Sequence, residues 1–311
     1  MPLSRLAKYA WGVLGFNLLV IVWGAYVRAT GSGAGCGAHW PFCNGEVIPR
    51  AAQIETIVEF IHRLTSGVAF LLVLGLFAAS WRKFPQAPHI RRAAAASMVF
   101  MVLEALVGAA IVLLEYVAEN QSAGRALWVA LHLANTFFLL ASLTLTAWWV
   151  SGGREVDFSQ SGLAWWGFGI GFFGILVLGI SGAITALGDT LFPVGSLVEG
   201  LQQDFSPAAH FLVRLRVWHP VSAAVIGLYL IFLILVVGGY DKDRIVRRFA
   251  WLLGSLILIQ LAAGLVNLLL LAPVVMQLIH LLLADAIWIS LVLFAVSALR
   301  KSQSSSELRE S

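Results

Sequence analysis

Four histidines stand inside long apolar segments of a chain that has seven histidines in all. They are His62, His132, His219 and His280. If each segment is a membrane-spanning helix, each imidazole lies about four to eight residues from the same end, or roughly 6–12 Å deep at about 1.5 Å per residue. A polar side chain is costly in lipid and tends to mark a functional site. Four imidazoles at one depth therefore indicate a shared chemical role.

Ligation of iron is the chemistry that these imidazoles suit best. Two facing histidines on two helices can be the axial ligands of a haem iron, whereas structural zinc normally needs four nitrogen or sulfur ligands close together. Two of the four fall in each half of the chain, so the sequence predicts two haem sites. We name their ligands the first histidine pair, His62 with His132, and the second histidine pair, His219 with His280. For any one of these residues, the alternative is a packing histidine that hydrogen-bonds within the membrane.

Arginines beside these histidines could hold the propionates of a haem. Arg63 follows His62, and Arg214 and Arg216 precede His219. A guanidinium binds carboxylates through paired hydrogen bonds, so these three arginines are propionate candidates. The alternative is that their side chains extend to lipid phosphates.

A carboxylate distinguishes the first histidine pair from the second. Glu59 stands three residues before His62, whereas Arg216 stands three residues before His219. On a helix, the residue at i−3 shares a face with the histidine, so Glu59 could move protons or stabilise a developing positive charge at a haem edge. The alternative is an ion pair of Glu59 with Arg63 or another arginine. Two further carboxyl groups within apolar segments also need partners: Glu104 and Asp285.

Two cysteines, Cys36 and Cys43, stand in a glycine-rich stretch between the first two apolar segments. Their short spacing through glycine and proline allows the two Cα atoms to approach. The outer side of a bacterial membrane is oxidising, so a disulfide is permitted there. It would be either a structural staple of the loop or a redox-active pair, because a disulfide in a small exposed loop can be labile.

The composition defines the setting of these residues. Of the 311 residues, 60% are hydrophobic and 12% are charged, against about 25% charged in soluble domains. These values exclude an ordinary soluble enzyme, and also a disordered chain, which needs low hydrophobicity. The net charge is only +4, so the basic residues are better explained as membrane-topology signals than as a nucleic-acid surface.

Eight apolar segments are each long enough to cross a hydrocarbon layer of about 30 Å as a helix. They are about 9–27, 56–80, 93–114, 126–150, 162–187, 211–237, 249–271 and 276–299. Most Lys and Arg fall in one set of connecting loops, which the positive-inside rule assigns to the cytoplasm. Both termini are then cytoplasmic. The loops 28–55 and 188–210, and the ends of the segments nearest the four histidines, then lie toward the outer face.

The chain reads as two copies of one four-helix unit. Trp23–Gly31 resembles Ser181–Gly188, and Leu103–Gly108 resembles Ile259–Gly264. Four segments return the chain to its starting side, so the copies are parallel and related by a pseudo-two-fold axis along the membrane normal. We therefore expect an all-α polytopic membrane protein built as two four-helix bundles. The expected units are residues 1–150 (the first half), a cytoplasmic linker 151–161, residues 162–300 (the second half) and a disordered cytoplasmic tail 301–311.

Several motifs together resemble those of the haem A synthase family over nearly the whole chain. They are Gly24-Ala-Tyr-Val-Arg-Ala-Thr-Gly-Ser-Gly, the loop Cys36 to Trp40-Pro-Phe-Cys43, Glu59-Phe-Ile-His62-Arg63, His132, Trp218-His219-Pro220, and His280-Leu-Leu-Leu-Ala-Asp285. Glu-x-x-His-Arg is a weak pattern alone, but its register with the other histidines and the cysteine loop is specific. That family oxidises haem O to haem A for cytochrome oxidase assembly, converting a ring methyl group to a formyl group through successive hydroxylations.

The resemblance implies a role for each matching residue. The first histidine pair would hold the substrate haem, and Glu59 would be the carboxylate needed for turnover. The second histidine pair would ligate a haem B cofactor. Cys36 and Cys43 match a pair found in many bacterial members, implicated in haem transfer or electron supply. Some members carry a second cysteine pair between the fifth and sixth segments. Here that loop begins Asp189-Thr-Leu-Phe-Pro and has none, so the two halves are not expected to handle haem delivery alike.

The resemblance also implies a setting and partners. It places the protein in a bacterial cytoplasmic membrane, with a haem O synthase as substrate donor, an unidentified electron partner, and a homo-oligomer as one arrangement known in the family. Two other classes remain open. A di-haem cytochrome b electron carrier explains the four histidines but neither the difference between Glu59 and Arg216 nor the cysteine loop. A haem transporter or chaperone explains the cysteine loop but not two ligand pairs.

Overall fold

The computed structural model describes residues 3–50, 53–157 and 162–300, and within them the protein is helical throughout, with eight candidate membrane spans. Seven spans are single helices: α1 (Arg5–Ala29), α2 (Ile54–Lys83), α3 (Pro88–Leu113), α4 (Ala123–Val150), α5 (Leu163–Leu191), α9 (Arg244–Leu269) and α10 (Val274–Ala298). The sixth span contains α7 (Phe211–Leu215), α8 (Trp218–Leu233) and a wider turn at Ile234–Gly238. A short helix, α6 (Leu197–Asp204), lies outside the spans. The predicted fold class is confirmed.

Most of the helices begin before or end after the apolar segments that predicted them. The segment 56–80, for example, lies within α2, which runs from Ile54 to Lys83. Hydropathy ends a span at the first polar residues, but the backbone of a membrane helix stays hydrogen-bonded to itself beyond them. The count and order of the spans predicted from hydropathy are therefore right. Most predicted ends fall short of the helix, whereas the ends at 114, 271 and 299 and the start at 162 run one or two residues past it.

The sixth span is not the continuous helix that the sequence predicts. The chain breaks between α7 and α8, at Arg216 and Val217. Pro220 explains the break, because a proline ring clashes with the carbonyl four residues earlier, here that of Arg216. That carbonyl instead accepts from the backbone N–H of His219 at 3.2 Å, and Pro220 falls in the first turn of α8, where its missing N–H has no cost.

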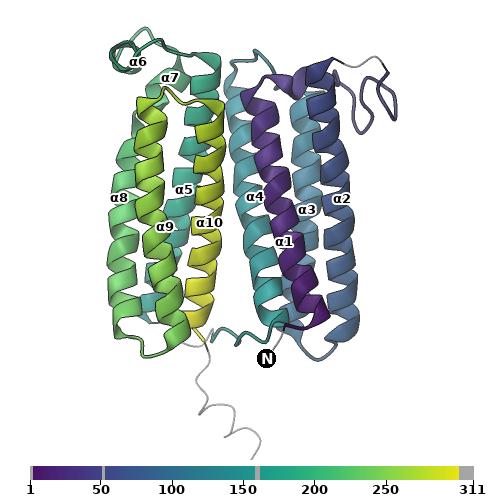
Figure 1. Cartoon of the computed structure of the whole chain (residues 1–311), viewed down its shortest axis with the longest axis vertical. Coiled ribbons are helices and arrows are strands. Elements are labelled where there is room, and N and C mark those ends of the chain that lie inside the picture. The colour runs from purple at the N-terminus through teal and green to yellow at the C-terminus, as the bar shows by residue number, and fades with distance from the viewer. Residues whose placement is uncertain (1–2, 51–52, 158–161, 301–311) are drawn as a thin grey trace, which may run out of the picture.

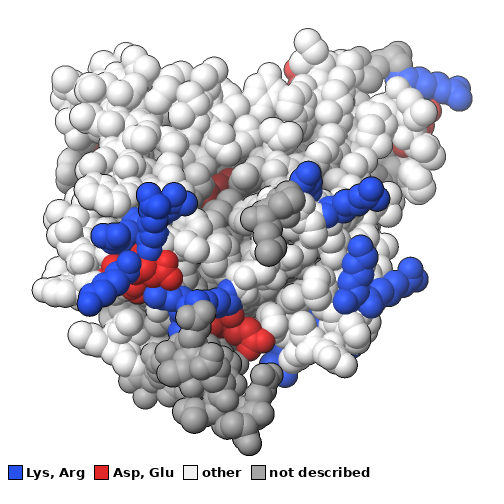
Figure 2. All heavy atoms as spheres, turned by 60° about the horizontal axis from the view of Figure 1, so that its bottom comes forward, with Lys and Arg blue, Asp and Glu red and all other residues white. Residues whose placement is uncertain are grey.

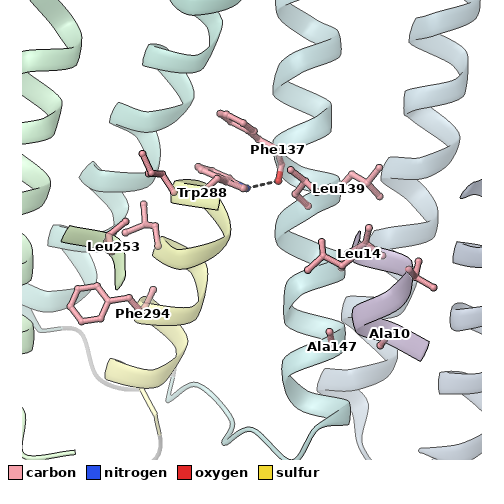
Figure 3. Packing of buried hydrophobic residues seen from close by; sticks show 14 of the residues in the cluster. Ala10, Leu14, Phe137, Leu139, Ala147, Leu253, Trp288 and Phe294 are labelled. Carbon is pink, nitrogen blue, oxygen red and sulfur yellow. Dashed lines mark hydrogen bonds between the residues drawn. The ribbon is translucent and has the colours of Figure 1, made fainter. Parts of the chain in front are cut away.

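The eight spans form two groups of four, α1–α4 and α5 with α8–α10, standing side by side (Figure 1). The groups meet mainly through α4, α5 and α10. In this contact the rings of Phe137 and Trp288 stack at 4.8 Å between centroids, and Trp288 Nε1 donates to the Phe137 carbonyl at 2.6 Å (Figure 3). One buried hydrophobic core therefore runs through both groups.

Basic side chains gather at the end of the molecule where α1 begins, and Figure 2 shows them on that face. Because the spans alternate in direction, this end also holds the end of α2, the start of α3 and the start of α9. The four intramembrane histidines lie toward the opposite end. Residues 158–161 of the predicted linker and the whole predicted tail 301–311 fall outside the described residues, and the side of the membrane that each end faces stays a prediction.

Candidate functional site

Each of the four intramembrane histidines packs against a glycine on an adjacent span. The pairs are Gly24 with His62, Gly108 with His132, Gly182 with His219, and Gly264 with His280. A Cβ added at Gly24, Gly182 or Gly264 would lie 2.8, 2.9 or 3.0 Å from Cε1 of its histidine. A Cβ added at Gly108 would lie 3.9 Å from Cε1 of His132. Since real Cβ atoms essentially never lie within 3.0 Å of a neighbouring atom and are seldom closer than 3.4 Å, three of the four rings occupy space that glycine leaves open.

The second histidine pair has a spacing that suits a metal between the rings. The imidazole centroids of His219 and His280 lie 6.3 Å apart, with the ring planes at 78°. Metal–imidazole bonds of about 2 Å on both sides would place the ring centres roughly 6 Å apart. Ser181 Oγ lies 3.0 Å from His219 Nδ1, which leaves the other ring nitrogen of that histidine for a ligand. Nδ1 of His280 is buried without a hydrogen-bond partner. The residues present therefore fit a haem iron.

The first histidine pair is arranged in a related way. His62 and His132 are near enough to interact electrostatically, and Nδ1 of His62 is buried without a hydrogen-bond partner. His132 Nδ1 lies 3.5 Å from Glu104 Oε1. The carboxyl group of Glu104, which needed a partner in the sequence, is thus placed beside a candidate iron ligand. The structure brings the rings of the second predicted pair together, and His62 and His132 lie within electrostatic range of each other.

Glu59 is buried beside the first pair and is fully engaged. Its Oε1 accepts from Arg63 Nη2 at 2.5 Å and from Arg63 Nε at 3.1 Å, and its Oε2 accepts from the backbone N–H of Cys36 at 2.8 Å. Glu59 stands one helical turn before His62 on α2. The ion pair with Arg63, left open by the sequence, is the arrangement that the structure has.

Arg63 joins Glu59 to the cysteine loop. Its Nη1 donates to the carbonyls of His39 and Phe42 at 2.6 and 2.8 Å. The guanidinium therefore binds Glu59 and the loop, and a propionate role for Arg63 stays a prediction. The hydrogen bonds of Arg63 go to a carboxylate four residues earlier and to backbone carbonyls of the loop. The contact with the loop carbonyls has no signal in the sequence.

Cys36 and Cys43 form a disulfide, and both are buried. The disulfide closes the loop whose carbonyls bind Arg63 and whose Cys36 amide binds Glu59. The pairing predicted as permitted is present, and the loop that it closes is part of the surroundings of Glu59.

Arg216 keeps the i−3 relation to His219 that the sequence predicts, since its carbonyl accepts from the His219 N–H at 3.2 Å and Arg216 and Val217 both have helical backbone angles. It is buried, and its Nη1 and Nε lie 3.0 and 3.1 Å from carboxyl oxygens of Asp189 and Asp204. Burial raises the pKa of Asp204, and the charge of Arg216 opposes that shift. Arg216 thus ties α5 to α6, although its Nε and Nη2 both lack a hydrogen-bond partner. Arg214 is exposed and stays a propionate candidate.

Arg28 is a connecting residue that the sequence analysis did not single out. From α1 its Nη1 donates to the Ala186 carbonyl at 2.9 Å and to Thr190 Oγ1 at 3.1 Å, both on α5. Its Nη2 donates to Gln277 Oε1 on α10 at 3.0 Å. Arg28 therefore links the two halves at the end where the histidines lie. An arginine at the end of an apolar segment was the available signal.

Fold and site together define a class: an eight-span helical membrane protein with two histidine pairs at one depth, one of them beside a buried carboxylate. A family model described as "Cytochrome oxidase assembly protein" matches residues 7–292. The chain therefore belongs to this family, COX15-CtaA, and the resemblance predicted from the motifs is confirmed at the level of the family.

Individual relatives carry two different names. A Thermus thermophilus protein named "Protoheme IX farnesyltransferase" is 54% identical over 307 residues, which cover 99% of this chain and 50% of that protein. A "Heme A synthase" of Bacillus mycoides is 44% identical over 111 residues, covering 35% of this chain and 36% of that protein. A "Heme A synthase" of Bacillus cereus is 48% identical over 95 residues, 30% of each. The chain spans about half the length of the Thermus relatives.

Proposed function

We propose that this protein is a haem A synthase, a membrane oxidoreductase that converts a methyl group of haem O to the formyl group of haem A. The observation that carries the proposal is the asymmetry of the two sites. Both halves bring two histidines together against glycines, but among the described residues only the first half places a buried carboxylate, Glu59, one helical turn from a histidine. Such an oxidation needs one site in which the substrate reacts and a second site that holds a cofactor, and the two halves differ in this way.

In this proposal the first histidine pair holds the substrate haem and the second pair holds haem B. A bound haem B would supply one-electron chemistry. The chain's own groups position the substrate and handle protons. Glu59 is fixed between the Arg63 guanidinium and the Cys36 amide, so its carboxylate points in one direction and can take a proton released as the methyl group is oxidised.

The name of the Thermus relatives favours a second candidate, transfer of a farnesyl group to haem. A prenyl diphosphate is normally bound through Mg²⁺ and a cluster of carboxylates. Within the described ranges, no group of three or more His, Cys, Asp or Glu side chains is placed to hold a metal ion. The farnesyltransferase name can belong to the half of those relatives that this chain does not cover. We therefore favour oxidation over prenyl transfer.

Expression in two bacterial hosts separates these functions. One host makes haem B but neither haem O nor haem A, and the other also contains a haem O synthase. Total haem is extracted and identified by liquid chromatography with mass spectrometry. The proposal expects haem A only in the second host. Haem O in the first host would indicate a farnesyltransferase, and bound but unmodified haem in both would favour an electron carrier or haem transporter.

We further propose that the end with the four histidines faces outward and that the termini are cytoplasmic. The basic side chains around the starts of α1, α3 and α9 support this orientation. We also propose that a haem O synthase supplies the substrate, that a separate partner exchanges electrons with the protein, and that the protein forms a homo-oligomer. Accessibility of single introduced cysteines to a membrane-impermeant thiol reagent tests the orientation, and labelling in the loop between α3 and α4 but not between α2 and α3 is expected.

A further inference from the structure

The two halves differ in the side chain that faces the histidine of their last span. Glu104 on α3 has its Oε1 3.5 Å from Nδ1 of His132, whereas Gln260 on α9 has its Nε2 3.1 Å from Nε2 of His280. Both residues occupy the same place in the internal repeat, since each stands four residues before the glycine that packs against the histidine. One imidazole therefore faces a carboxyl group and the other an amide.

The carboxyl group of Glu104 is held in place by α4. Asn135 Nδ2 donates to Oε2 at 2.5 Å, and Thr136 Oγ1 donates to Oε1 at 2.6 Å. These donors are the third and fourth residues after His132 on the same helix. The helix that carries the imidazole thus also fixes the carboxyl group beside it. No such pair of donors is found for Gln260 among the described residues, and its Oε1 is buried without a hydrogen-bond partner.

We propose that Glu104 and Gln260 give the two haem sites different reduction potentials, with Glu104 lowering the potential of the first site relative to the second. This inference rests on the function proposed above. A negative charge beside a ligating imidazole stabilises ferric over ferrous iron, and the Glu104 carboxyl group lies 3.5 Å from Nδ1 of His132 without a hydrogen bond between them. The neutral amide of Gln260 turns its donor nitrogen toward His280 and brings no negative charge to the second site. Hydrogen bonding around the ligands is one of the means by which a protein tunes a haem potential.

The difference gives electron flow between the halves a direction. If one electron were shared by the two irons of bound haems, the first-site haem would be left ferric and the second-site haem would become ferrous, with no other reactant consumed. This is the direction that oxidation of a substrate held by the first histidine pair requires. Glu104 and Gln260 are thus positioning residues that act through the imidazoles rather than on the substrate.

Reciprocal exchange of the two side chains tests the inference. Glu104→Gln and Gln260→Glu are purified from cells that make haem O, and the haem-loaded proteins are titrated against potential by absorbance. The two waves are assigned with His62→Ala and His219→Ala, each of which removes a ligand from one site. Glu55→Gln, at an exposed position at the start of α2, is the control for loss of a carboxylate.

Opposite shifts are expected in the two exchanged variants. Glu104→Gln should raise the reduced-to-oxidised ratio of the first wave about tenfold at a fixed potential, about 59 mV for one electron. Gln260→Glu should lower the second wave by a similar amount, and Glu55→Gln should move neither. Unmoved waves, or shifts of the same sign, would overturn the inference. If Glu104→Gln loses the first haem, the Gln260→Glu arm decides alone. Haem A formation is followed separately, so failure of the proposed function would leave the two potential shifts visible.

Discussion

Replacing Gly182 with alanine should expel haem from the second half while leaving α5 intact. The added Cβ would lie 2.9 Å from Cε1 of His219. Carbon atoms in ordinary contact are about 3.5–4.0 Å apart, so the imidazole must retreat by roughly 0.6–1.1 Å. Metal–ligand distances vary by only about 0.2 Å, so a displacement of this size breaks the bond to iron. Overpacking itself should cost about 1–3 kcal/mol of stability.

Gly108→Ala is the matched control. Its Cβ would lie 3.9 Å from Cε1 of His132, an ordinary contact. Both changes favour the helix by about 0.8–1.0 kcal/mol in intrinsic propensity, so a difference between them reports on the histidines. The assay is haem bound per protein after purification, with the low-spin absorbance spectrum and helix content by circular dichroism. Normal haem in Gly182→Ala, or equal losses in both variants, would refute the reasoning.

Four further changes test Glu59, the cysteine loop, the second pair and the contact between the halves. Glu59→Ala should abolish haem A while the second-site haem stays bound, and normal haem A in extracts would remove Glu59 from turnover. Cys36→Ser with Cys43→Ser should lower haem A formation, because the loop loses about 2.5 kcal/mol of stabilisation from the disulfide and the Cys36 amide is no longer fixed. Unchanged haem A formation would indicate that the disulfide is only a structural staple of the loop. His219→Ala should lose the low-spin haem B spectrum, and a retained spectrum would reassign the ligand. Arg28→Met should lower the stability in detergent by about 2 kcal/mol or more, and an unchanged melting temperature would contradict its linking role.

The spans and the histidine pairs could be predicted because each follows from a local pattern. Long apolar segments have few stable alternatives to helices in lipid, and equal depth on alternate helices places His219 near His280. The repeat also placed Gly24 and Gly182 in matching positions. The packing of these glycines against imidazole rings could not be predicted, because it depends on which neighbouring helix carries the histidine that contacts them.

The arginines show why the rest could not be predicted. Arg63 and Arg216 were propionate candidates because a cation beside a histidine has no visible partner in a linear sequence. In the structure, Arg63 binds a carboxylate one turn away and loop carbonyls, and Arg216 binds Asp189 and Asp204. Local chemistry indicated how a guanidinium would bind, and tertiary contacts decided which oxygen it met. Only the break at Arg216 had a local signal, in Pro220.

The central claim is tested most directly by the identity of the haem that the protein produces. The intact protein is expressed in cells that contain a haem O synthase and no other source of haem A, and the extracted haem is identified by mass. The account predicts a haem that carries both the farnesyl chain and a formyl group in place of a ring methyl. Haem O recovered unchanged, from protein that binds haem at both histidine pairs, would contradict it.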